Sequence, residues 1–249
     1  MTDFSFQLYS ARNFPPLEPI LKRLAELGYK QVEPYGGQFA DPPALAAQIK
    51  AAGLTAPTAH IGLDMLEQTS KTIDAAGALG VKIIFCPAIG REQRSQEETG
   101  WVALGEKLAG LAEIYNKAGF GFGWHNHDFE FVPTPSGKLP MNLILDTAPT
   151  LQWEMDVAWL VKGKQAPFDW FQQYGDRITA IHVKDLALPG QNTDEDGWAD
   201  VGYGELDWQQ TYTEIKADTK AQYFVMEHDN PKDVDRFARR SIETASKWK

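Results

Sequence analysis

The five histidines of this chain all stand at or just after the end of a predicted β-strand, and they are His60, His125, His127, His182 and His228. Four acidic residues occupy the same kind of position, and they are Glu33, Glu130, Asp156 and Glu227. Carboxylates and imidazoles that converge in this way repel one another unless a cation lies among them. Mixed oxygen and nitrogen donors suit manganese, magnesium, cobalt or zinc. The pattern therefore predicts one site for a divalent metal ion.

The residue types favour four metal ligands, namely Glu130, Asp156, His182 and Glu227. Each also has a structural interpretation, because a carboxylate after a strand often caps the next helix and a lone inward histidine is more often a hydrogen-bonded core residue. Asp156, His182 and Glu227 stand on three consecutive predicted strands, however. Three independent caps or core contacts explain that arrangement less well than one joint site does.

Other residues near these strand ends have two interpretations each. Lys184 follows His182 by two residues, so it points to the same side of the strand and reaches toward a substrate oxygen, unless it merely begins an exposed loop. Cys86, the only cysteine, is interpreted as a small buried side chain rather than a nucleophile. Four tryptophans are interpreted as packing residues more than as sugar-stacking residues, and they are Trp124, Trp153, Trp159 and Trp198.

The sequence predicts repeated βα units that position these residues. Short stretches rich in β-branched and aromatic residues alternate with longer amphipathic stretches. The predicted strands are residues 4–9, 31–34, 54–59, 82–86, 120–126, 151–156, 178–183 and 222–227. Two of the predicted helices are residues 17–27, ended by Gly28, and 101–118, ended by Gly119. Eight units predict a (β/α)8 TIM barrel that forms one domain over residues 1–249.

The main alternative fold is an open doubly wound sheet, in which a glycine-rich phosphate-binding turn usually follows the first strand. This chain has the sequence Ser10-Ala11-Arg12-Asn13 there, so the barrel is preferred. In a barrel, the long connections 128–139 and 185–206 would overhang the mouth at the carboxyl ends of the strands, where barrel enzymes place their chemistry.

Composition narrows the classes of function. The 249 residues are 43% hydrophobic and carry a formal net charge of −10, which disfavours a surface for nucleic acid or membranes. No basic and apolar leader begins the sequence and no run approaches the roughly 20 apolar residues of a membrane helix, so we expect a cytoplasmic protein. A single cysteine excludes an intrachain disulfide and paired-cysteine zinc sites. The sequence leaves open whether the chain forms a homo-oligomer.

Six features carry a resemblance to a known family. They are residues 59–64 (AHIGLD), 125–131 (HNHDFEF), 154–157 (EMDV), 182–185 (HVKD) and 201–208 (VGYGELDW), and the late Glu227. Together they resemble the xylose isomerase-like TIM-barrel family, often called sugar phosphate isomerases and epimerases, and the resemblance covers the whole chain. It implies a sugar or keto-sugar substrate and one divalent ion, with manganese expected before magnesium, cobalt or zinc.

The resemblance also implies a ligand set. In that family the metal is held by a glutamate after strand five, an aspartate after strand six, a histidine after strand seven and a glutamate after strand eight. The last three roles fall to Asp156, His182 and Glu227. At the first position the family's epimerases usually carry glutamate, whereas this chain has His125. Either Glu130 folds back to complete the metal site, which we favour, or a histidine of the His-Asn-His segment binds the metal directly.

The activity implied by the resemblance is that of a metal-dependent sugar isomerase or epimerase. Such an enzyme removes a proton next to a carbonyl and forms a metal-stabilised enediolate. The catalytic candidates are Glu227 as the first choice of base, His127 as the second, and Glu130. The substrate-binding candidates are Glu33, His60, His125 and Lys184.

Other functions compete with this one. The His-Asn-His segment is similar to branches of the family that include inositol-type dehydratases and enzymes that eliminate or hydrate 3-keto-glycosides, so a metal-dependent lyase or hydratase is the alternative enzyme. A sugar-binding barrel without turnover is the non-enzymatic alternative. A metal-dependent endonuclease for abasic DNA shares the fold, but the acidic charge and the few histidines of this chain disfavour it.

Overall fold

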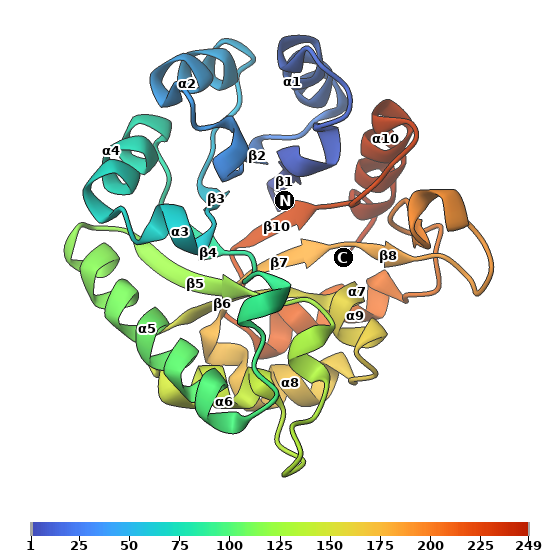
Figure 1. Cartoon of the computed structure of the whole chain (residues 1–249). Helices are drawn as coiled ribbons and strands as arrows, with labels where there is room; N and C mark the ends of the chain where they lie inside the picture. The colour runs from blue at the N-terminus through green and yellow to red at the C-terminus, as the bar shows by residue number, and fades with distance from the viewer. Residues whose placement is uncertain (1, 249) are drawn as a thin grey trace.

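The eight strands of the barrel follow the stretches predicted from the sequence. In the computed structural model, which describes residues 2–248, they are β1 (Phe4–Gln7), β2 (Gln31–Glu33), β3 (Thr58–His60), β4 (Ile83–Cys86), β5 (Gly121–His125), β6 (Gln152–Asp156), β7 (Ile178–Val183) and β10 (Tyr223–Met226). Neighbouring strands are parallel, in the order β2-β1-β10-β7-β6-β5-β4-β3. Isolated bridges from Gln31 to Thr55 and from Tyr35 to His60 join the two end strands. The predicted (β/α)8 barrel is therefore confirmed (Figure 1).

Helices surround this sheet on its outer side (Figure 1). The α-helices are α1 (Leu17–Leu27), α2 (Pro42–Ala51), α3 (Leu63–Leu66), α4 (Thr69–Leu79), α5 (Glu98–Lys117), α6 (Pro140–Thr147), α7 (Val157–Lys162), α8 (Pro167–Tyr174), α9 (Trp208–Asp218) and α10 (Val234–Ala245). The short 3-10 helices are η1 (Leu8–Ala11), η2 (Gly36–Gln38), η3 (Arg91–Gln93), η4 (Phe129–Phe131), η5 (Gly175–Arg177) and η6 (Thr193–Glu195). None of the helices described between residues 2 and 248 is long and apolar enough to cross a membrane.

Local sequence signals explain where several elements begin and end. Helix α1 stops at Gly28, whose φ of +106° is a left-handed conformation that glycine adopts without strain. Helix α5 begins at Glu98 rather than at residue 101. Strand β3 begins at Thr58 rather than at residue 54, because Pro57 has no N–H for a ladder and contributes only its carbonyl, which accepts from Lys82 and Ile83.

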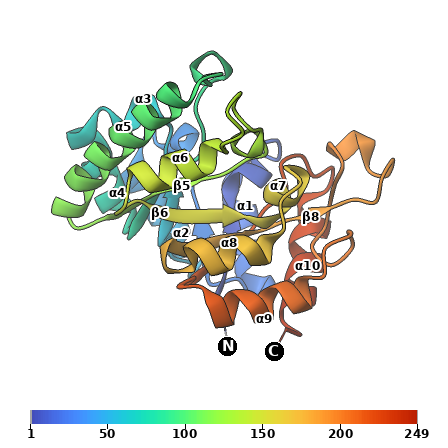
Figure 2. The ribbon, with the colours of Figure 1, turned by 90° about the horizontal axis from the view of Figure 1, so that it is seen from below.

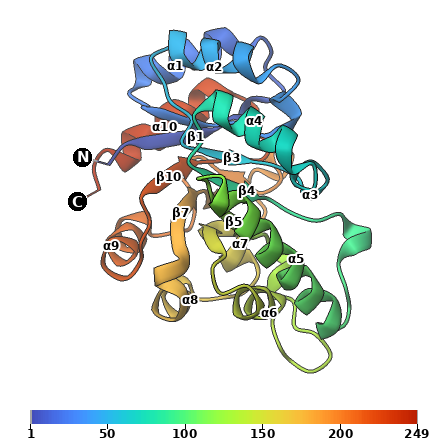
Figure 3. The same ribbon diagram turned by 90° about the vertical axis from the view of Figure 1, so that its left-hand side faces the viewer.

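The long connection after β7 is an ordered structure. It contains the antiparallel pair β8 (Asp185–Leu186) and β9 (Trp198–Ala199). The buried carboxylate of Asp185 fastens it by accepting four backbone hydrogen bonds at 2.9 to 3.2 Å, from Leu186, Gly202, Gly204 and Leu206. The segment therefore holds Trp198 in a fixed place beside the barrel mouth. The two ends of the described chain lie close together (Figures 2 and 3). Phe4 packs there against Trp248, with ring centroids 5.9 Å apart.

The interior of the barrel is polar, and this polarity is what positions the site. Along β6, Trp153 and Met155 pack in the hydrophobic core, whereas Glu154 and Asp156 alternate with them and lie inside the barrel. Other buried polar side chains from β1, β2 and β3 are Ser5, Gln7, Glu33, Thr58 and His60. Barrel interiors are usually filled by branched apolar residues. The buried polar residues of this barrel therefore require an explanation other than hydrophobic packing.

Candidate metal centre

One set of donors, here called the outer group, lies at the carboxyl ends of four strands and consists of His125, Asp156, His182 and Glu227. One ligand atom from each lies within 4.8 Å of the others, and all four residues are buried. His182 Nδ1 is 2.9 Å from Glu227 Oε2 and 4.0 Å from Asp156 Oδ2. Within residues 2–248, Asp156 Oδ2 has no hydrogen-bond partner, whereas Oδ1 accepts the N–H of Trp159.

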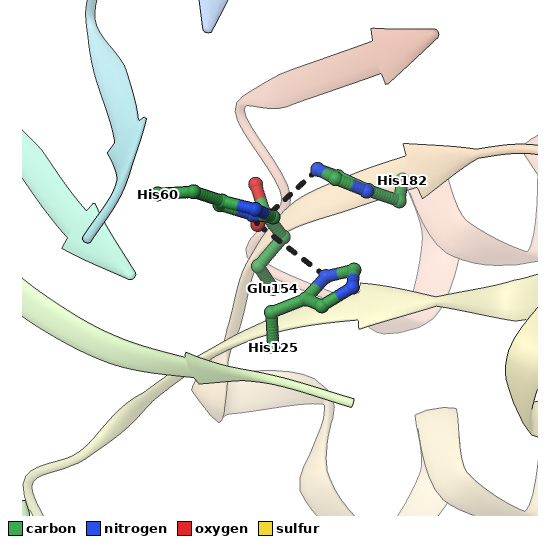
Figure 4. A group of neighbouring side chains, drawn as sticks. All are labelled: His60, His125, Glu154 and His182. Carbon is green, nitrogen blue, oxygen red and sulfur yellow. Dashed lines mark hydrogen bonds and ion pairs between the residues drawn. The ribbon is translucent and has the colours of Figure 1, made fainter. Parts of the chain in front are cut away.

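A second set, the inner group, contains Glu154 and three imidazoles, and its members are His60, His125, Glu154 and His182 (Figure 4). Glu154 Oε2 lies between the rings, 2.5 Å from His60 Nε2 and 3.3 Å from His182 Nε2. The same oxygen is 3.5 Å from His125 Nδ1. Glu33 Oε1 borders the group, 3.2 Å from His60 Nε2 and 2.9 Å from His182 Nε2. The carboxylates of Glu33 and Glu154 thus contact all three imidazoles of this layer.

The His182 ring connects the two groups. Its Nδ1 faces Glu227 in the outer group, and its Nε2 faces Glu33 and Glu154 in the inner layer. A neutral imidazole that binds a metal through one nitrogen carries its proton on the other. His182 can therefore bind an ion through Nδ1 while Nε2–H donates to Glu33, which is the arrangement that fixes the orientation of metal-binding histidines.

The electrostatics of both groups favour an added positive charge. Burial raises the pKa of Asp156 to about 7, although the Lys184 ammonium opposes the shift. Burial and the neighbouring Glu33 carboxylate raise the pKa of Glu154 to about 7. Glu227 differs, because Lys184 and His182 outweigh its burial and hold its pKa well below the usual range. A cation among these carboxylates would favour their ionised forms.

Lys184 supplies the fixed cation beside the outer group. Its side chain is fully buried, with Nζ 2.5 Å from Asp229 Oδ2 and 3.3 Å from Glu227 Oε2. The ammonium also lies over two aromatic rings, 4.0 Å from the centroid of Trp198 and 5.0 Å from that of Trp159. The carboxylates of Asp229 and Glu227 raise the pKa of Lys184 despite its burial. Lys184 is therefore a permanently charged partner that positions Glu227.

A cavity of about 590 Å³ is lined by two members of the outer group, His125 and Glu227. Its wall includes His60, His125, His127 and Glu227, and its rim carries Tyr9, Arg12 and Tyr35. The two tyrosine rings meet edge to face with centroids 5.3 Å apart, and the Arg12 guanidinium lies 3.9 Å from the Tyr9 centroid. A volume of this size lies within the range of small-molecule sites. The cavity brings a ligand to the outer group.

His127 is the imidazole best placed to move a proton in this cavity. Its Nδ1 has no hydrogen-bond partner among residues 2–248, and its ring packs on those of Phe129 and Trp159. Burial, with the charge of Lys184, lowers the pKa of His127 to about 3. The ring is therefore neutral near neutral pH, and it would hold a proton only transiently.

The donor chemistry of the outer group fits a divalent metal ion. Two carboxylates and two imidazoles converge there, and Asp156 Oδ2 lacks a hydrogen-bond partner within the described chain. Oxygen-rich sets with imidazole suit manganese, magnesium, cobalt or zinc. The residues present could therefore hold such an ion.

Known proteins similar to this chain identify its family and fold. No curated protein sequence matches the chain. The sequence model of the family described as xylose isomerase-like TIM barrel matches residues 21–248. The chain belongs to this family.

Solved structures similar to this xylose isomerase-like barrel share its fold along the whole length. A sugar phosphate isomerase/epimerase from Parabacteroides distasonis has a TM-score of 0.84 at 20% identity, covering 99% of this chain and 96% of that one. A probable 3-DHS dehydratase from Bacillus anthracis has a TM-score of 0.78 at 12% identity, covering 100% of both chains. The IolI protein with a bound zinc atom has a TM-score of 0.76 at 16% identity, covering 99% and 96%.

The structure brings most of the predicted site residues of this xylose isomerase-like barrel together. Asp156, His182 and Glu227 meet in the outer group, and His125 joins them. Glu130 belongs to neither group among the described residues, because Oε1 accepts from Trp124 Nε1 at 3.0 Å and Oε2 from the His127 backbone at 2.9 Å. His125, rather than Glu130, is the residue of this segment that lies beside the other three predicted donors.

Three other predicted residues occupy places that the sequence did not specify. Lys184 contacts Glu227 and Asp229 and does not line the cavity described above. Glu33 is fully buried in the inner layer, where Gln7 Nε2 donates to it at 2.7 Å. His228 lies outside both groups, and its Nδ1 accepts the N–H of Asn230.

Sequence reasoning missed Glu154, which lies in the inner group. A signal for it was present, because Glu154 precedes Asp156 by two residues and therefore shares its face of the strand. A carboxylate in the middle of a strand predicts a solvent-exposed position rather than a buried one, because ionised side chains are almost never fully buried unless they are paired.

Proposed function

We propose that this protein is a divalent-metal-dependent sugar isomerase or epimerase that moves a proton next to a substrate carbonyl. The observation that carries the proposal is the placement of two proton carriers around the outer group. Glu227 follows β10 and His127 follows β5, and both line the same cavity. Strands β7 and β6 lie between them in the sheet and carry His182 and Asp156. A substrate over the metal donors would thus have a base on each side.

The outer group would hold the ion through Asp156, His182 Nδ1 and Glu227, with His125 as a fourth donor within reach. A divalent ion bound there acts as a Lewis acid, which polarises a carbonyl and makes the neighbouring C–H more acidic. We favour manganese because carboxylate oxygens form half of this donor set.

The side chains of the cavity supply the proton transfers. Glu227 stays ionised because Lys184 and His182 neutralise it, so its carboxylate can accept a proton from one side. The neutral His127 ring would take up a proton from the other side only transiently and then pass it on. His60 lines the same cavity and can donate a hydrogen bond to a substrate oxygen. Return of the proton to the opposite face gives epimerisation, and return to the adjacent carbon gives isomerisation.

The cavity favours a neutral sugar as the substrate. Its wall carries the carboxylates of Asp196, Glu227 and Asp229, whereas Arg12 is the guanidinium at its rim. A single guanidinium and no lysine among the lining residues leave few cationic partners for a phosphorylated ligand. Aromatic rings at the rim, those of Tyr9 and Tyr35, offer apolar faces to sugar C–H groups.

A lyase or dehydratase is the second candidate, and one observation favours it. His125 occupies the outer group where the family's epimerases usually carry glutamate, which changes the balance of acids and bases around the substrate. The first step would be the same proton abstraction. His127 would then pass the proton that it had removed to the departing hydroxyl or glycosyl oxygen on the adjacent carbon.

The test is proton exchange in heavy water, with manganese-loaded protein and a panel of neutral ketoses and 3-keto-glycosides. We expect deuterium at the carbon next to the carbonyl, with at least about a 100-fold loss of exchange in His127→Asn and Glu227→Gln. Product analysis separates an epimer or isomer from an elimination product. Binding of the sugars without exchange at any carbon would refute the enzymatic proposal and favour a sugar-binding protein.

A further inference from the structure

We propose that the inner group binds a second divalent cation, preferably zinc, through His60 Nε2, His125 Nδ1 and Glu154 Oε2. This proposal rests on the proposed function only in assigning the first ion to Asp156, His182 and Glu227. His125, which is within reach of both positions, would bind the inner ion when that ion is present, so the two ions would share no ligand. The outer ion would have one nitrogen and two carboxylates, and the inner ion two nitrogens and one carboxylate.

The spacing of the inner donors suits such an ion. Ligands about 2.0 to 2.1 Å from a tetrahedral zinc ion lie about 3.3 Å from one another. Glu154 Oε2 is 3.5 Å from His125 Nδ1, close to that spacing. The shorter contact of 2.5 Å joins Glu154 Oε2 to His60 Nε2, and an ion between these atoms would replace their hydrogen bond. One ligand atom from each of the four residues lies within 4.8 Å of the others.

Two atoms of the inner group remain without partners within residues 2–248. They are His125 Nδ1 and Glu154 Oε1, and both belong to residues that are 2% exposed or less. Buried polar groups are nearly always satisfied, so such atoms require an explanation. An ion bound to His125 Nδ1 satisfies one of them, and bidentate binding by Glu154 satisfies the other.

The rings divide between the two ions without conflict. His182 binds the outer ion through Nδ1, and its remaining proton on Nε2 points to Glu33 Oε1 at 2.9 Å. His125 turns its Nδ1 toward Glu154, and His60 turns its Nε2 toward the same oxygen. Glu33 and Glu154 are both fully buried and need positive charge nearby. The inner ion supplies that charge once His182 is committed to the outer ion as a neutral ligand.

The donor types predict different metals at the two positions. Two imidazoles with one carboxylate form a set that zinc commonly uses when a further position stays open. The outer set is richer in oxygen and suits manganese better. An ion can enter the inner group from the cavity, because His60 and His125 line the cavity wall.

The experiment is a metal titration of the full chain, first stripped with a chelator and then incubated with zinc alone or with zinc and manganese. Metal is measured by elemental analysis after gel filtration, and bound manganese by electron paramagnetic resonance. We expect two ions per wild-type chain, one zinc and one manganese in the mixture. Glu154→Gln and His60→Gln should each lose the zinc and keep the manganese, whereas Asp156→Asn should lose the manganese and keep the zinc.

Glu195→Gln is the matched control, because Glu195 is also a buried glutamate but pairs with Arg236 outside both groups. It should retain two ions, and thermal unfolding should show that each variant is folded. His60→Gln keeps the test valid if Glu154→Gln fails to fold. A single ion per wild-type chain, lost in Asp156→Asn and only weakened in Glu154→Gln, would overturn the inner site and leave the proposed function standing. Metal binding unaffected by Asp156→Asn and by Glu227→Gln would instead refute the outer site.

Discussion

The ion pair between Lys184 and the outer group gives the sharpest prediction of stability. Lys184→Met keeps an unbranched side chain of similar length but removes a buried charge that lies 3.3 Å from Glu227 and 3.9 Å from Asp156. At an effective dielectric constant of about 20, opposite charges 3.3 Å apart attract by about 5 kcal/mol. Removing one partner of a buried pair typically costs about 3 to 5 kcal/mol. We expect a loss of this size in the metal-free protein, seen as a fall in Tm of about 6 to 20 °C.

The same substitution should strengthen metal binding, because the Lys184 ammonium competes with an ion for Glu227 and Asp156. We expect the dissociation constant for manganese to fall by about tenfold, which corresponds to about 1.4 kcal/mol. Saturating manganese should then recover more stability in Lys184→Met than in the wild type. Calorimetric titration and thermal unfolding with and without manganese measure the two effects.

Lys162→Met is the matched control for this experiment. Lys162 Nζ lies 4.3 and 4.5 Å from the ring centroids of Trp159 and Trp198, the same two rings that Lys184 approaches, but the Lys162 side chain is exposed. We expect it to cost about 1 kcal/mol or less and to leave manganese affinity unchanged. Equal effects of the two substitutions would refute the argument from the carboxylates.

The pH dependence of the Lys184→Met effect follows from Glu227 and Asp156. The pKa of Glu227 is lowered in the folded chain, so it contributes stability above its unfolded pKa of about 4.3 that is lost as the pH falls through the folded value. Lys184 is a main cause of the lowering. The stability difference between the wild type and Lys184→Met should therefore be largest near pH 8. It should narrow below about pH 7 as Asp156, whose pKa Lys184 also lowers, is protonated, and narrow again in stronger acid as Glu227 is protonated.

Four further predictions concern single residues. Glu130→Gln should keep the full metal content by elemental analysis, because Glu130 lies in neither group, and loss of the ion would restore it as a ligand. Manganese affinity should fall as the pH drops below about 7, because protonation of Asp156, whose pKa is about 7, competes with the ion. Cys86, whose buried thiol has a pKa of about 12, should resist iodoacetamide until the chain is unfolded. Asp185→Ala should cost about 3 to 5 kcal/mol in denaturant unfolding, because four backbone N–H groups lose their acceptor.

Periodicity and strand-end chemistry were enough to predict the barrel and the meeting of Asp156, His182 and Glu227, because parallel strands bring their carboxyl ends to one face. The prediction that Glu130 is a metal ligand depended on how the loop after the fifth strand folds. The alternation of apolar and polar residues does not determine the geometry of a loop. Trp124 and the backbone of His127 already satisfy both oxygens of that carboxylate.

The depth of the site also escaped sequence reasoning, for a different physical reason. Strand ends attract attention because catalysis occurs there, whereas Glu154 stands inside a strand. The burial of a carboxylate within a strand can be predicted only when the side chains that pair with it are known. The partners of Glu154 come from β3, β5 and β7, so they become visible only when the sheet has closed.

The inner carboxylates impose a cost that packing does not explain. Glu33 and Glu154 are both 0% exposed, and apolar residues of similar volume would fill the barrel at least as stably as a buried ionic cluster. What an apolar layer could not do is hold the His182 ring, whose Nε2 is within 3.3 Å of both carboxylates while Nδ1 faces the outer group. Without these acceptors the ring could rotate, and the outer donors would lose their fixed geometry. The chemistry proposed for the mouth of the barrel therefore depends on charges placed one layer deeper.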